Sequence, residues 1–335
     1  MERRDRRFYM HENMELLFLG TGASWPSVER NVPAVALKRG SEILLFDCGE
    51  GTQRQFQRSG ASYMQVAKIF ITHLHGDHYY GLPGLVQTMR LNDRKEPLQI
   101  IGPPGLKQKC IDFDVVPRES KDNRKRDTGF KVQIAEVTSG QVMEFPGYKV
   151  IAREVRHTTY ALAYAVVEDS RPGRFNKPRA LELGVPEGKM FGQLQRGEAV
   201  TLEDGRAITP DMVLGPTRRG RKFVYTGDCV PCEQTVELAQ GADILVHEST
   251  YANDFPDANK HGHSTSAQAA FIAKAAKVNT LYLTHISPRY TNAKPLVEEA
   301  RKIFPETHEA HDLLQVVVKF PPDEEAAAPE TKPTS

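Results

Sequence analysis

The sequence predicts a layered α/β fold in which two β-sheets pack against each other and helices cover their outer sides. Two observations lead to this prediction. Strands outnumber helices early and late in the chain, and helices follow the turns that end strands. Four strands also end in a side chain that can bind a metal, namely His73, His157, Asp228 and His285. Such distant residues converge only if their strands share one edge, so we expect a crevice there.

Length and composition describe one large domain or two ordinary ones. The chain has 335 residues, and its apolar and charged fractions are those of a soluble globular protein. It contains no run of about 18 apolar residues, as a membrane span requires. Four cysteines in a chain this long do not suggest a disulfide scaffold, so we expect a reducing, cytoplasmic compartment.

The two ends differ from the rest. Residues 1–13 are charged and lack an apolar segment, so we expect an N-terminal extension rather than a secretory signal, with Met14 a possible start. Residues 321–335 contain mainly Pro, Glu, Ala, Lys and Thr and predict a disordered tail. The catalytic domain is therefore expected at 14–320.

Apolar runs separated by turn residues place the elements of the first half. Val, Ile, Leu and Phe dominate the runs, and turns such as Gly20-Thr21-Gly22 separate them. Helix-forming stretches lie at 52–58, at 79–90 and around Cys110. Strands are expected at 14–19, 32–38, 41–47, 66–72, 98–101, 130–137, 141–145, 148–155 and 161–167.

The second half predicts shorter strands and one well-defined helix. That helix is 264–277, with Ser264 or Thr265 as its N-cap and an alanine-rich body. Two further helices are expected at 236–239 and 293–304. The strands are expected at 223–226, 244–246, 280–283 and 314–318.

The most informative stretch is 72–78, Thr-His-Leu-His-Gly-Asp-His, directly after an apolar strand. A tight turn there would direct His73, His75 and His78 to a single spot. Imidazole nitrogen and carboxylate oxygen suit zinc, and also manganese or iron. A polar loop with clustered histidines is the alternative, but this spacing after a strand favours a metal site. Asp47 also ends a buried-looking strand, so its carboxylate should lie at the rim of a sheet.

Two further features bear on function. Cys229-Val230-Pro231-Cys232 lacks both a thioredoxin-like context and a second cysteine pair, so coincidence is the favoured interpretation over a redox or zinc pair. Segment 171–222 holds 11 Lys or Arg against 6 Asp or Glu, a net charge of +5 in a chain of +1. Its 13 Gly or Pro among 52 residues predict that it has no packed core, and long irregular insertions are usually functional or disordered. A second basic cluster spans 118–126.

The residues resemble the metallo-β-lactamase superfamily through 73–78, His157, Asp228 and His285, and within it the ribonuclease Z family of tRNA 3′-processing endonucleases. The narrower resemblance extends from about 14 to 320 and implies a four-layer αββα sandwich with a protruding basic arm. It rests on the strings MELLFLGTG (14–22), FDCGEG (46–51), FITHLHGDHYYGLPGL (70–85), GEAVTLEDGR (197–206), HEST (247–250), HST (263–265) and LTHISPRY (283–290).

The resemblance implies a site with two zinc ions, with manganese as an alternative. One ion would lie on His73, His75 and His157, the other on Asp77, His78 and His285, with Asp228 bridging them. Ions about 3.5 Å apart would activate a water as hydroxide, so that no protein nucleophile is needed. Asp77 is expected to orient and deprotonate this water, His263 to protonate the leaving 3′ oxygen with Glu248 as its partner, and Asp47 to fix an imidazole orientation.

The resemblance also implies the substrate and the assembly. In the family, the segment corresponding to 171–222 is an arm that grips the tRNA elbow, often across a homodimer. The expected phosphate contacts here are Arg171, Arg174, Lys177, Arg218, Arg219 and Arg221. Two positions depart from the family pattern: Val28 replaces a common Lys in a loop linked to discrimination of CCA ends, and Cys229 replaces a common Thr.

The leading hypothesis is therefore a zinc-dependent endoribonuclease that leaves a tRNA 3′-OH and a trailer with a 5′ phosphate. One alternative is a phosphodiesterase of the same fold that acts on small molecules, which the basic arm disfavours. Another is a non-catalytic RNA-binding relative, which the intact set of ligands disfavours.

Overall fold

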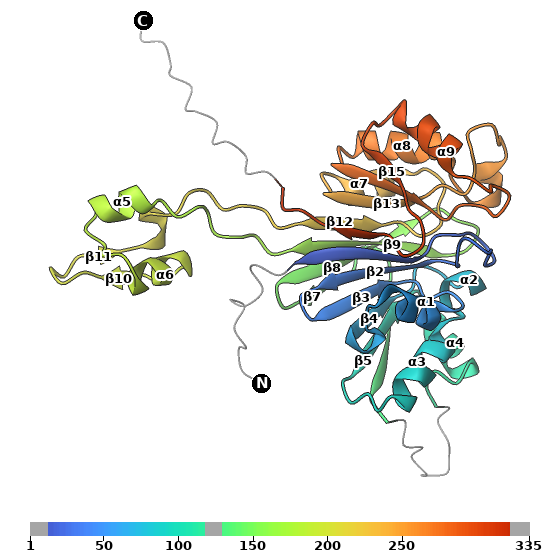
Figure 1. Ribbon diagram of the computed structural model, residues 1–335, viewed down its shortest axis with the longest axis horizontal. Helices are drawn as coiled ribbons and strands as arrows, with labels where there is room; N and C mark the ends of the chain where they lie inside the picture. Colours follow the sequence, from blue (N-terminus) through green and yellow to red (C-terminus); the bar gives the residue numbers. More distant parts are fainter. Residues whose placement is uncertain (1–12, 118–128, 322–335) are drawn as a thin grey trace, which may run out of the picture.

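The structure, a computed structural model, describes residues 13–117 and 129–321. The described residues form the expected four layers, in which two sheets face each other and helices cover the outer sides (Figure 1). Residues 1–12 of the N-terminal extension, 322–335 of the tail and the basic cluster 118–126 lie outside the described residues.

The first sheet has seven strands in the order β16-β1-β2-β3-β4-β5-β6. Strands β3 to β6 run parallel, whereas β16, β1 and β2 pair antiparallel. Its central strands are buried on both faces, which explains their nearly continuous apolar sequences. The strands are β1 (Met14–Gly20), β2 (Ala34–Arg39), β3 (Glu42–Phe46), β4 (Val66–Phe70), β5 (Leu98–Gly102), β6 (Val132–Glu136) and β16 (Gln315–Val317).

The second sheet also has seven strands, in the order β15-β14-β13-β12-β9-β8-β7. Strands β12 to β15 are parallel, and β8 shares their direction because β9 is antiparallel to both β8 and β12. The strands are β7 (Val142–Phe145), β8 (Tyr148–Val155), β9 (Ala161–Glu168), β12 (Lys222–Tyr225), β13 (Ile244–Glu248), β14 (Thr280–Thr284) and β15 (Thr307–Glu309). The sequence did not reveal β15, a short polar segment with no apolar period that pairs only with β14.

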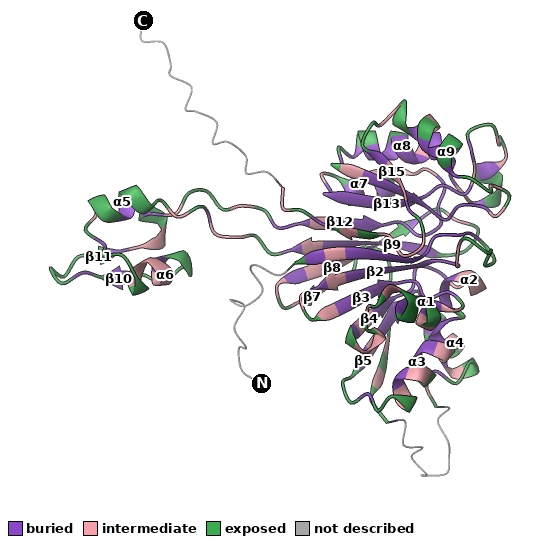
Figure 2. Cartoon of the chain, viewed as in Figure 1, coloured by how far each residue is buried: buried purple, intermediate pink, exposed green. Residues whose placement is uncertain are grey.

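Helices cover both outer faces, and three apolar clusters separate the layers (Figure 2). Between the sheets, Phe46 contacts the rings of Phe70, Tyr164 and Phe223. Helices α1 (Thr52–Ser59), α2 (Gly76–Tyr79), α3 (Leu82–Leu91) and α4 (Leu106–Asp112) lie on the first sheet, and α7 (Glu233–Ala239), α8 (Ser266–Ala275) and α9 (Lys294–Arg301) on the second. The short 3₁₀ turns are η2 (Tyr63–Gln65), η3 (Pro210–Met212) and η4 (Ala258–His261).

Two helices differ in detail from the expectation. The helix predicted at 79–90 corresponds to α3, which begins only at Leu82 with Pro83 in its first turn, and the separate short helix α2 precedes it. Helix α8 begins as predicted, with Thr265 as N-cap. Its hydroxyl accepts the backbone N–H of Gln268, and the Gln268 side chain accepts the backbone N–H of Thr265.

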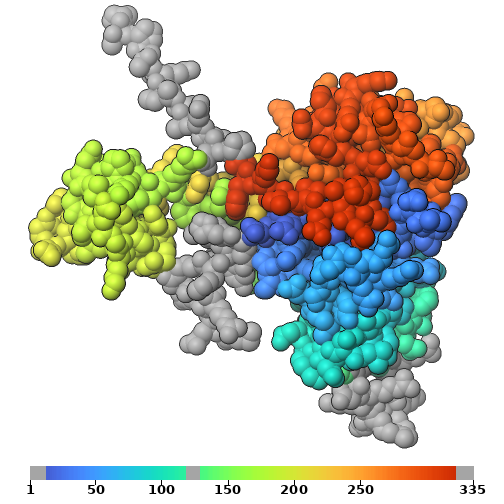
Figure 3. All heavy atoms as spheres, in the orientation of Figure 1, coloured from blue at the N-terminus to red at the C-terminus, as the bar shows by residue number. Residues whose placement is uncertain are grey.

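The segment between β9 and β12 projects from the body as an arm that ends in a small lobe (Figures 1 and 3). The lobe contains α5 (Lys177–Glu182), α6 (Lys189–Gln195), β10 (Val200–Thr201) and β11 (Ala207–Ile208). The expectation that its Gly and Pro content excludes a packed core is wrong. Ala180, Val185, Leu194, Ile208 and Val213 are buried together there. The glycines serve turns and the stalk, where a Cβ on Gly173 would lie 1.8 Å from the carbonyl oxygen of Gly215.

The arm and the ligand-bearing edge lie at opposite ends of β9. Glu168, where the arm starts, pairs with Tyr148, whereas Ala161 pairs with Val155, just before His157. Among residues 13–117 and 129–321, we find no helix with the length and apolar character that a membrane crossing demands.

Candidate metal centre

The metal motif occupies the turn that connects β4 to α2. Residues after Phe70 continue past the end of the sheet, and α2 begins at Gly76. The ring of Tyr80 packs closely over Gly76, where a Cβ would lie 2.2 Å from the ring. His73 and His75 therefore extend from the loop, whereas Asp77 and His78 extend from the first turn of the helix.

Three strand ends of the second sheet bring the remaining ligands to the same place. His157 follows β8, Asp228 follows β12 and His285 follows β14, and these strands share one direction. The two sheets are tied together here by the backbone N–H of Leu162, which donates to the carbonyl oxygen of Thr72 at 2.9 Å. The convergence that the sequence predicted thus arises from strand direction.

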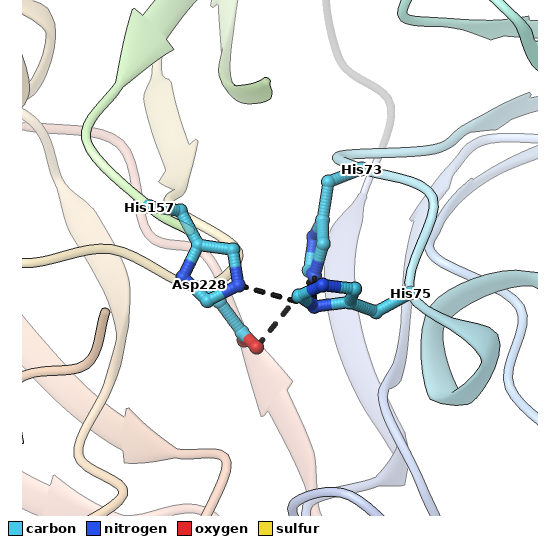
Figure 4. A group of neighbouring side chains, drawn as sticks. All are labelled: His73, His75, His157 and Asp228. Carbon is cyan, nitrogen blue, oxygen red and sulfur yellow. Dashed lines mark hydrogen bonds and ion pairs between the residues drawn. The ribbon is translucent and has the colours of Figure 1, made fainter. Parts of the chain in front are cut away.

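The seven candidate ligands lie in two adjoining groups. One group is His73, His75, His157 and Asp228 (Figure 4), and the other is Asp77, His78 and His285. Within each group the potential ligand atoms lie within 4.8 Å of one another. Nδ1 of His75 is 3.0 Å from Nε2 of His73 and 3.1 Å from Nε2 of His157. These separations are close to the roughly 3.3 Å edge of a tetrahedron around a zinc ion with ordinary Zn–N bonds.

Asp228 lies between the two groups. Its Oδ1 is 3.2 Å from Nε2 of His285, and its Oδ2 is 3.3 Å from Nε2 of His78 and 3.8 Å from Nε2 of His73. One carboxylate therefore faces imidazoles of both groups. A bridging carboxylate between two ions would have this placement.

The outer nitrogens of the imidazoles are held by fixed partners, which direct the other nitrogen inward. Nδ1 of His78 is 2.7 Å from Oδ2 of Asp47, as expected for a carboxylate that fixes an imidazole. Asp47 also accepts hydrogen bonds from the backbone N–H of Thr72 at 2.8 Å and the hydroxyl of Tyr225 at 2.9 Å. Nδ1 of His157 lies 2.7 Å from the carbonyl oxygen of Gly262.

Several inward-facing atoms lack hydrogen-bond partners within the described residues. This observation bears on whether a metal ion fits the centre. Nε2 of His78, Nε2 of His285 and Oδ1 of Asp228 are buried, and none has a hydrogen-bond partner within the described part of the chain. Buried polar atoms are rarely left unsatisfied, so these three call for a partner that is not protein. A divalent cation satisfies nitrogen and carboxylate oxygen together, and the residues fit it.

The electrostatics of the centre agree with this fit. Burial lowers the pKa of His73, His75 and His157, which keeps these imidazoles in the neutral form that binds metals. At His78 the carboxylates of Asp228 and Asp77 outweigh burial and raise the pKa. Without a cation, a proton on His78 balances the negative charge that a metal ion would otherwise neutralise.

The carboxylate of Asp77 faces the two histidines of its own group. Its Oδ2 accepts the backbone N–H of Ser24 at 2.9 Å and lies 3.5 Å from Nε2 of His78 and 3.6 Å from Nε2 of His285. Burial would raise the pKa of Asp77, but the charges of the two histidines outweigh burial and hold it below the usual range. Ser24 belongs to the loop that carries Val28, whose side chain is almost fully exposed.

His263 stands beside both groups, backed by a buried carboxylate. It precedes the N-cap of α8, and its Nδ1 lies 2.9 Å from Oε1 of Glu248. Burial opposes protonation, but the adjacent Glu248 outweighs it and raises the pKa of His263 to about 9. Glu248 is only 1% exposed, so its carboxylate contacts His263 and is shielded from the open side of the centre.

The residues predicted to contact phosphate divide into two sets. Arg174 and Lys177 are exposed on the arm. Arg221 is 3% exposed and forms an ion pair with Glu168 at 2.6 Å, so the expectation of a phosphate contact there is wrong.

The other predicted arginines lie at the root of the arm. Arg219 pairs with Asp243 through both terminal nitrogens, at 2.7 and 2.8 Å. Arg171 and Arg218 exchange backbone hydrogen bonds, and the guanidinium of Arg171 lies 3.6 Å from the ring centroid of Phe320. The Arg219 side chain is still 44% exposed, whereas Arg171 and Arg218 are half-buried. Composition could not reveal these contacts, because the partners are distant in the sequence.

The cysteine pair has no metal-binding partners within the described residues, and all four cysteines of the chain carry free thiols. The loop instead joins the two turns that carry the candidate ligands Asp228 and His157. The backbone N–H of Val230 donates to the carbonyl oxygen of Arg156 at 2.8 Å, which links the turn after Asp228 to the turn before His157. Cys229 itself is buried, 3.8 Å from Nε2 of His247, which also belongs to neither group of ligands.

Sequence reasoning missed three positioning contacts. Oγ1 of Thr250 lies 2.8 Å from Nδ1 of His285 and donates to or accepts from it, and the backbones of Gly262 and Ser24 hold His157 and Asp77. Thr250 lies in the string His-Glu-Ser-Thr at the end of β13, which could have drawn attention to it. The two backbone contacts leave no signal in the identity of a side chain.

Comparisons with known proteins agree with this architecture. A family model described as the anti-Pycsar protein Apyc1 matches residues 14–171, and one described as a beta-lactamase superfamily domain matches residues 203–286. The chain is 43% identical to Ribonuclease Z of Archaeoglobus fulgidus over 309 residues, 91% of this chain and 98% of that protein. It is 46% identical to Ribonuclease Z of Halorubrum lacusprofundi over 295 residues, 87% and 93% of the two chains.

A solved structure extends the likeness to three dimensions. The short form of human tRNase Z superposes with a TM-score of 0.64 at 28% identity, covering 92% of this chain and all of that one. Identity above 40% along nearly the whole length of a relative, with the ligand set in place, is decisive. The chain belongs to the ribonuclease Z family.

Proposed function

We propose that this protein is a zinc-dependent endoribonuclease that removes the 3′ trailer from precursor tRNA. The products are a tRNA ending in a 3′-OH and a trailer carrying a 5′ phosphate. Membership of the family supports the substrate. The single observation that carries the chemistry is the paired set of ligands around Asp228.

In this proposal the centre would bind two zinc ions, and manganese could replace them. His73, His75 and His157 would hold one ion, Asp77, His78 and His285 would hold the other, and Asp228 could serve both groups. When bound, such ions act as Lewis acids at the scissile phosphate and make a bound water more acidic.

Asp77 orients the attacking water and accepts its proton. The Oδ2 atom is engaged by Ser24 and faces His78 and His285, which leaves Oδ1 for the water. Because water is the nucleophile, no protein side chain forms a bond to phosphorus. The lowered pKa keeps Asp77 ionised at neutral pH, so its carboxylate can accept a hydrogen bond from the water and orient it.

His263 donates the proton that the leaving 3′ oxygen needs. Its ring lies beside both groups, with centroids 5.2 Å from that of His157 and 5.3 Å from that of His285. The contact with Glu248 favours the protonated imidazole, which is the form that can act as an acid. The two proton-transfer residues thus have opposite charge states, as acid and base require.

The arm contributes affinity for tRNA, and the protein acts as a cytoplasmic homodimer. Arg174 and Lys177, both exposed on the arm, contact phosphates without reading sequence. The separate apolar core of the lobe gives these side chains a rigid base far from the metal centre. Free thiols in all four cysteines are consistent with a reducing compartment.

The direct test is incubation of zinc-loaded protein with precursor tRNAs that do or do not encode a CCA end, followed by mapping of both cut ends. Cleavage that leaves a 3′-OH on the tRNA and a 5′ phosphate on the trailer is expected. Cuts elsewhere in the tRNA, or the opposite phosphate position, would refute the proposal. The comparison of the two precursors also reports what Val28 does in the loop near Asp77.

Two variants separate this function from its alternatives. Replacing residues 171–219 with a short glycine-serine linker removes the arm but keeps the Arg221–Glu168 pair. We expect hydrolysis of bis(p-nitrophenyl) phosphate to persist and precursor cleavage to fall; equal losses would favour a small-molecule phosphodiesterase. Asp77→Ala should bind precursor tRNA without cutting it, whereas persistent cutting would overturn the role of Asp77.

A further inference from the structure

A groove of about 700 Å³ opens on the outer side of the metal centre, next to His157. Its walls are the end of β8, the turn that follows it, Ser139 from the loop before β7, and Gln234 from α7. His157 is the residue that joins the two regions, because it lines the groove and also faces His75 across 3.1 Å. A strand bound in the groove would therefore lie beside the metal centre, with His157 between the two.

The groove carries positive charge. Arg153 and Arg156 line it, against a single carboxylate, that of Glu154. The Arg153 side chain is 39% exposed. Its Nη2 lies 3.7 Å from Oε2 of Glu237, an exposed and therefore weak ion pair. The exposed part of this guanidinium can bind an anionic oxygen in the groove.

The remaining lining is polar, with one aromatic ring. Thr158, Thr159 and Ser139 supply hydroxyl groups. Tyr160 is 37% exposed, and its hydroxyl accepts the backbone N–H of Ser139 at 3.1 Å, which fixes the ring. Guanidinium groups, hydroxyls and an exposed ring are the groups with which proteins hold single-stranded nucleic acid.

We propose that this groove binds the single-stranded 3′ trailer of the precursor, with Arg153 and Arg156 on its phosphates and Tyr160 against a base. This inference rests on the proposed function. The groove volume suits a few unpaired nucleotides and not the duplex of an acceptor stem. His263, which serves the tRNA side of the cut, is not among the lining residues, so the strand in the groove is the one on the other side of the phosphate.

The loop of the cysteine pair gives the groove one of its supports. Arg156 donates from Nη2 to the carbonyl oxygen of Pro231 at 3.2 Å, and its own carbonyl oxygen accepts the N–H of Val230. The loop after Asp228 thus holds a groove arginine as well as a metal ligand. The link to the metal ligand runs through the backbone of Arg156, so a substitution of its side chain leaves the hydrogen bond to Val230 in place.

The test compares two precursors with the same tRNA body, one with a single-nucleotide trailer and one with a trailer of about ten nucleotides. In the double variant Arg153→Ala/Arg156→Ala, kcat/KM for the long trailer should fall by on the order of 10- to 100-fold. For the single-nucleotide trailer and for bis(p-nitrophenyl) phosphate it should change by less than about twofold, since neither reaches the groove. Equal falls for both precursors, or no fall, would overturn the proposal.

Matched variants check that the change in cleavage of the long-trailer precursor comes from the charge of the groove arginines. Glu237→Gln removes the competing carboxylate from Arg153 and should strengthen cleavage of the long-trailer precursor. Lys302→Ala removes an exposed charge outside the groove and should leave both precursors unaffected. Arg156→Gln keeps a polar side chain and serves if the double variant does not fold.

A binding measurement distinguishes failure of the groove from failure of the proposed function. Fluorescence anisotropy of a labelled ten-nucleotide RNA should show weaker binding to the double variant, with the slope of log K against log salt reduced by about 0.7 for each lost phosphate contact. If the wild type binds this RNA through the groove but cuts no precursor, the proposed function fails and the groove stands. Equal binding by the wild type and the double variant would show that the groove does not bind this RNA.

Discussion

Oδ2 of Asp47 lies 2.7 Å from Nδ1 of His78, and both side chains are fully buried. Asp47 directly follows β3 and His78 lies in α2, so the contact joins a strand end of the first sheet to the helix that follows β4. It fixes which nitrogen of His78 faces the metal centre. Asp47 therefore shapes the centre without belonging to it.

Asp47→Ala should weaken metal binding at the group containing His78 and lower precursor cleavage, on the order of 10- to 100-fold. The cause is loss of the partner that orients the imidazole. Metal content by mass spectrometry and kcat with excess zinc would measure both effects. Tyr225→Phe, which removes only one hydrogen bond to the same carboxylate, is the matched control and should have the smaller effect. Wild-type metal content in Asp47→Ala would contradict this role.

Removal of metal should destabilise the fold. The native state alone assembles the seven ligands, so a bound ion stabilises it by about 2.7 kcal/mol when free zinc is 100 times Kd. Chelation should lower the Tm, and zinc should restore it. Asp228→Ala, which deprives both groups of a shared ligand, should make the Tm much less sensitive to chelator. An unchanged wild-type Tm after verified removal of the metal would rule out this coupling.

Cleavage should decline on the alkaline side as His263 loses its proton. The pKa of His263 is raised to about 9, so the acid form dominates at neutral pH and disappears as the pH rises through this value. Bound cations would lower this pKa, so the alkaline limb is expected at or below about pH 9. Glu248→Gln removes the neighbouring negative charge and should move the limb to lower pH. An alkaline limb at the same pH in this variant would show that Glu248 does not set the pKa of the acid.

Two basic residues of the arm segment should affect different properties: Arg221 the stability of the fold, and Lys177 the binding of precursor tRNA. Arg221→Ala leaves Glu168 buried without its principal partner and should lower the free energy of unfolding by about 3–5 kcal/mol. Lys177→Ala breaks only an exposed pair with Glu187, worth about 0–1 kcal/mol, but should weaken precursor binding. Urea unfolding and binding at two salt concentrations would measure both. Reduced precursor binding by a stably folded Arg221 variant would reverse this assignment.

The fold was largely predictable because its elements have strong local signals. The apolar runs of β1 and β8 and the capped start of α8 appear in the structure within one or two residues of their predicted bounds. β15 and the lobe of the arm were missed for the same reason. Their few apolar side chains carry no periodic pattern, and only contacts with distant residues hold them in place.

The candidate metal ligands and the strand ends that carry them were predictable from the sequence alone, because residue type and hydrophobic pattern are local properties. Only the tertiary structure decided which nitrogen of each imidazole faces inward, since partners such as Thr250 and the carbonyl group of Gly262 are distant in the chain. It also decided which arginines are exposed. Arg221 and Lys177 both lie in the basic arm segment, but Glu168 from β9 buries only Arg221, because ion pairing there depends on the sheet and not on composition.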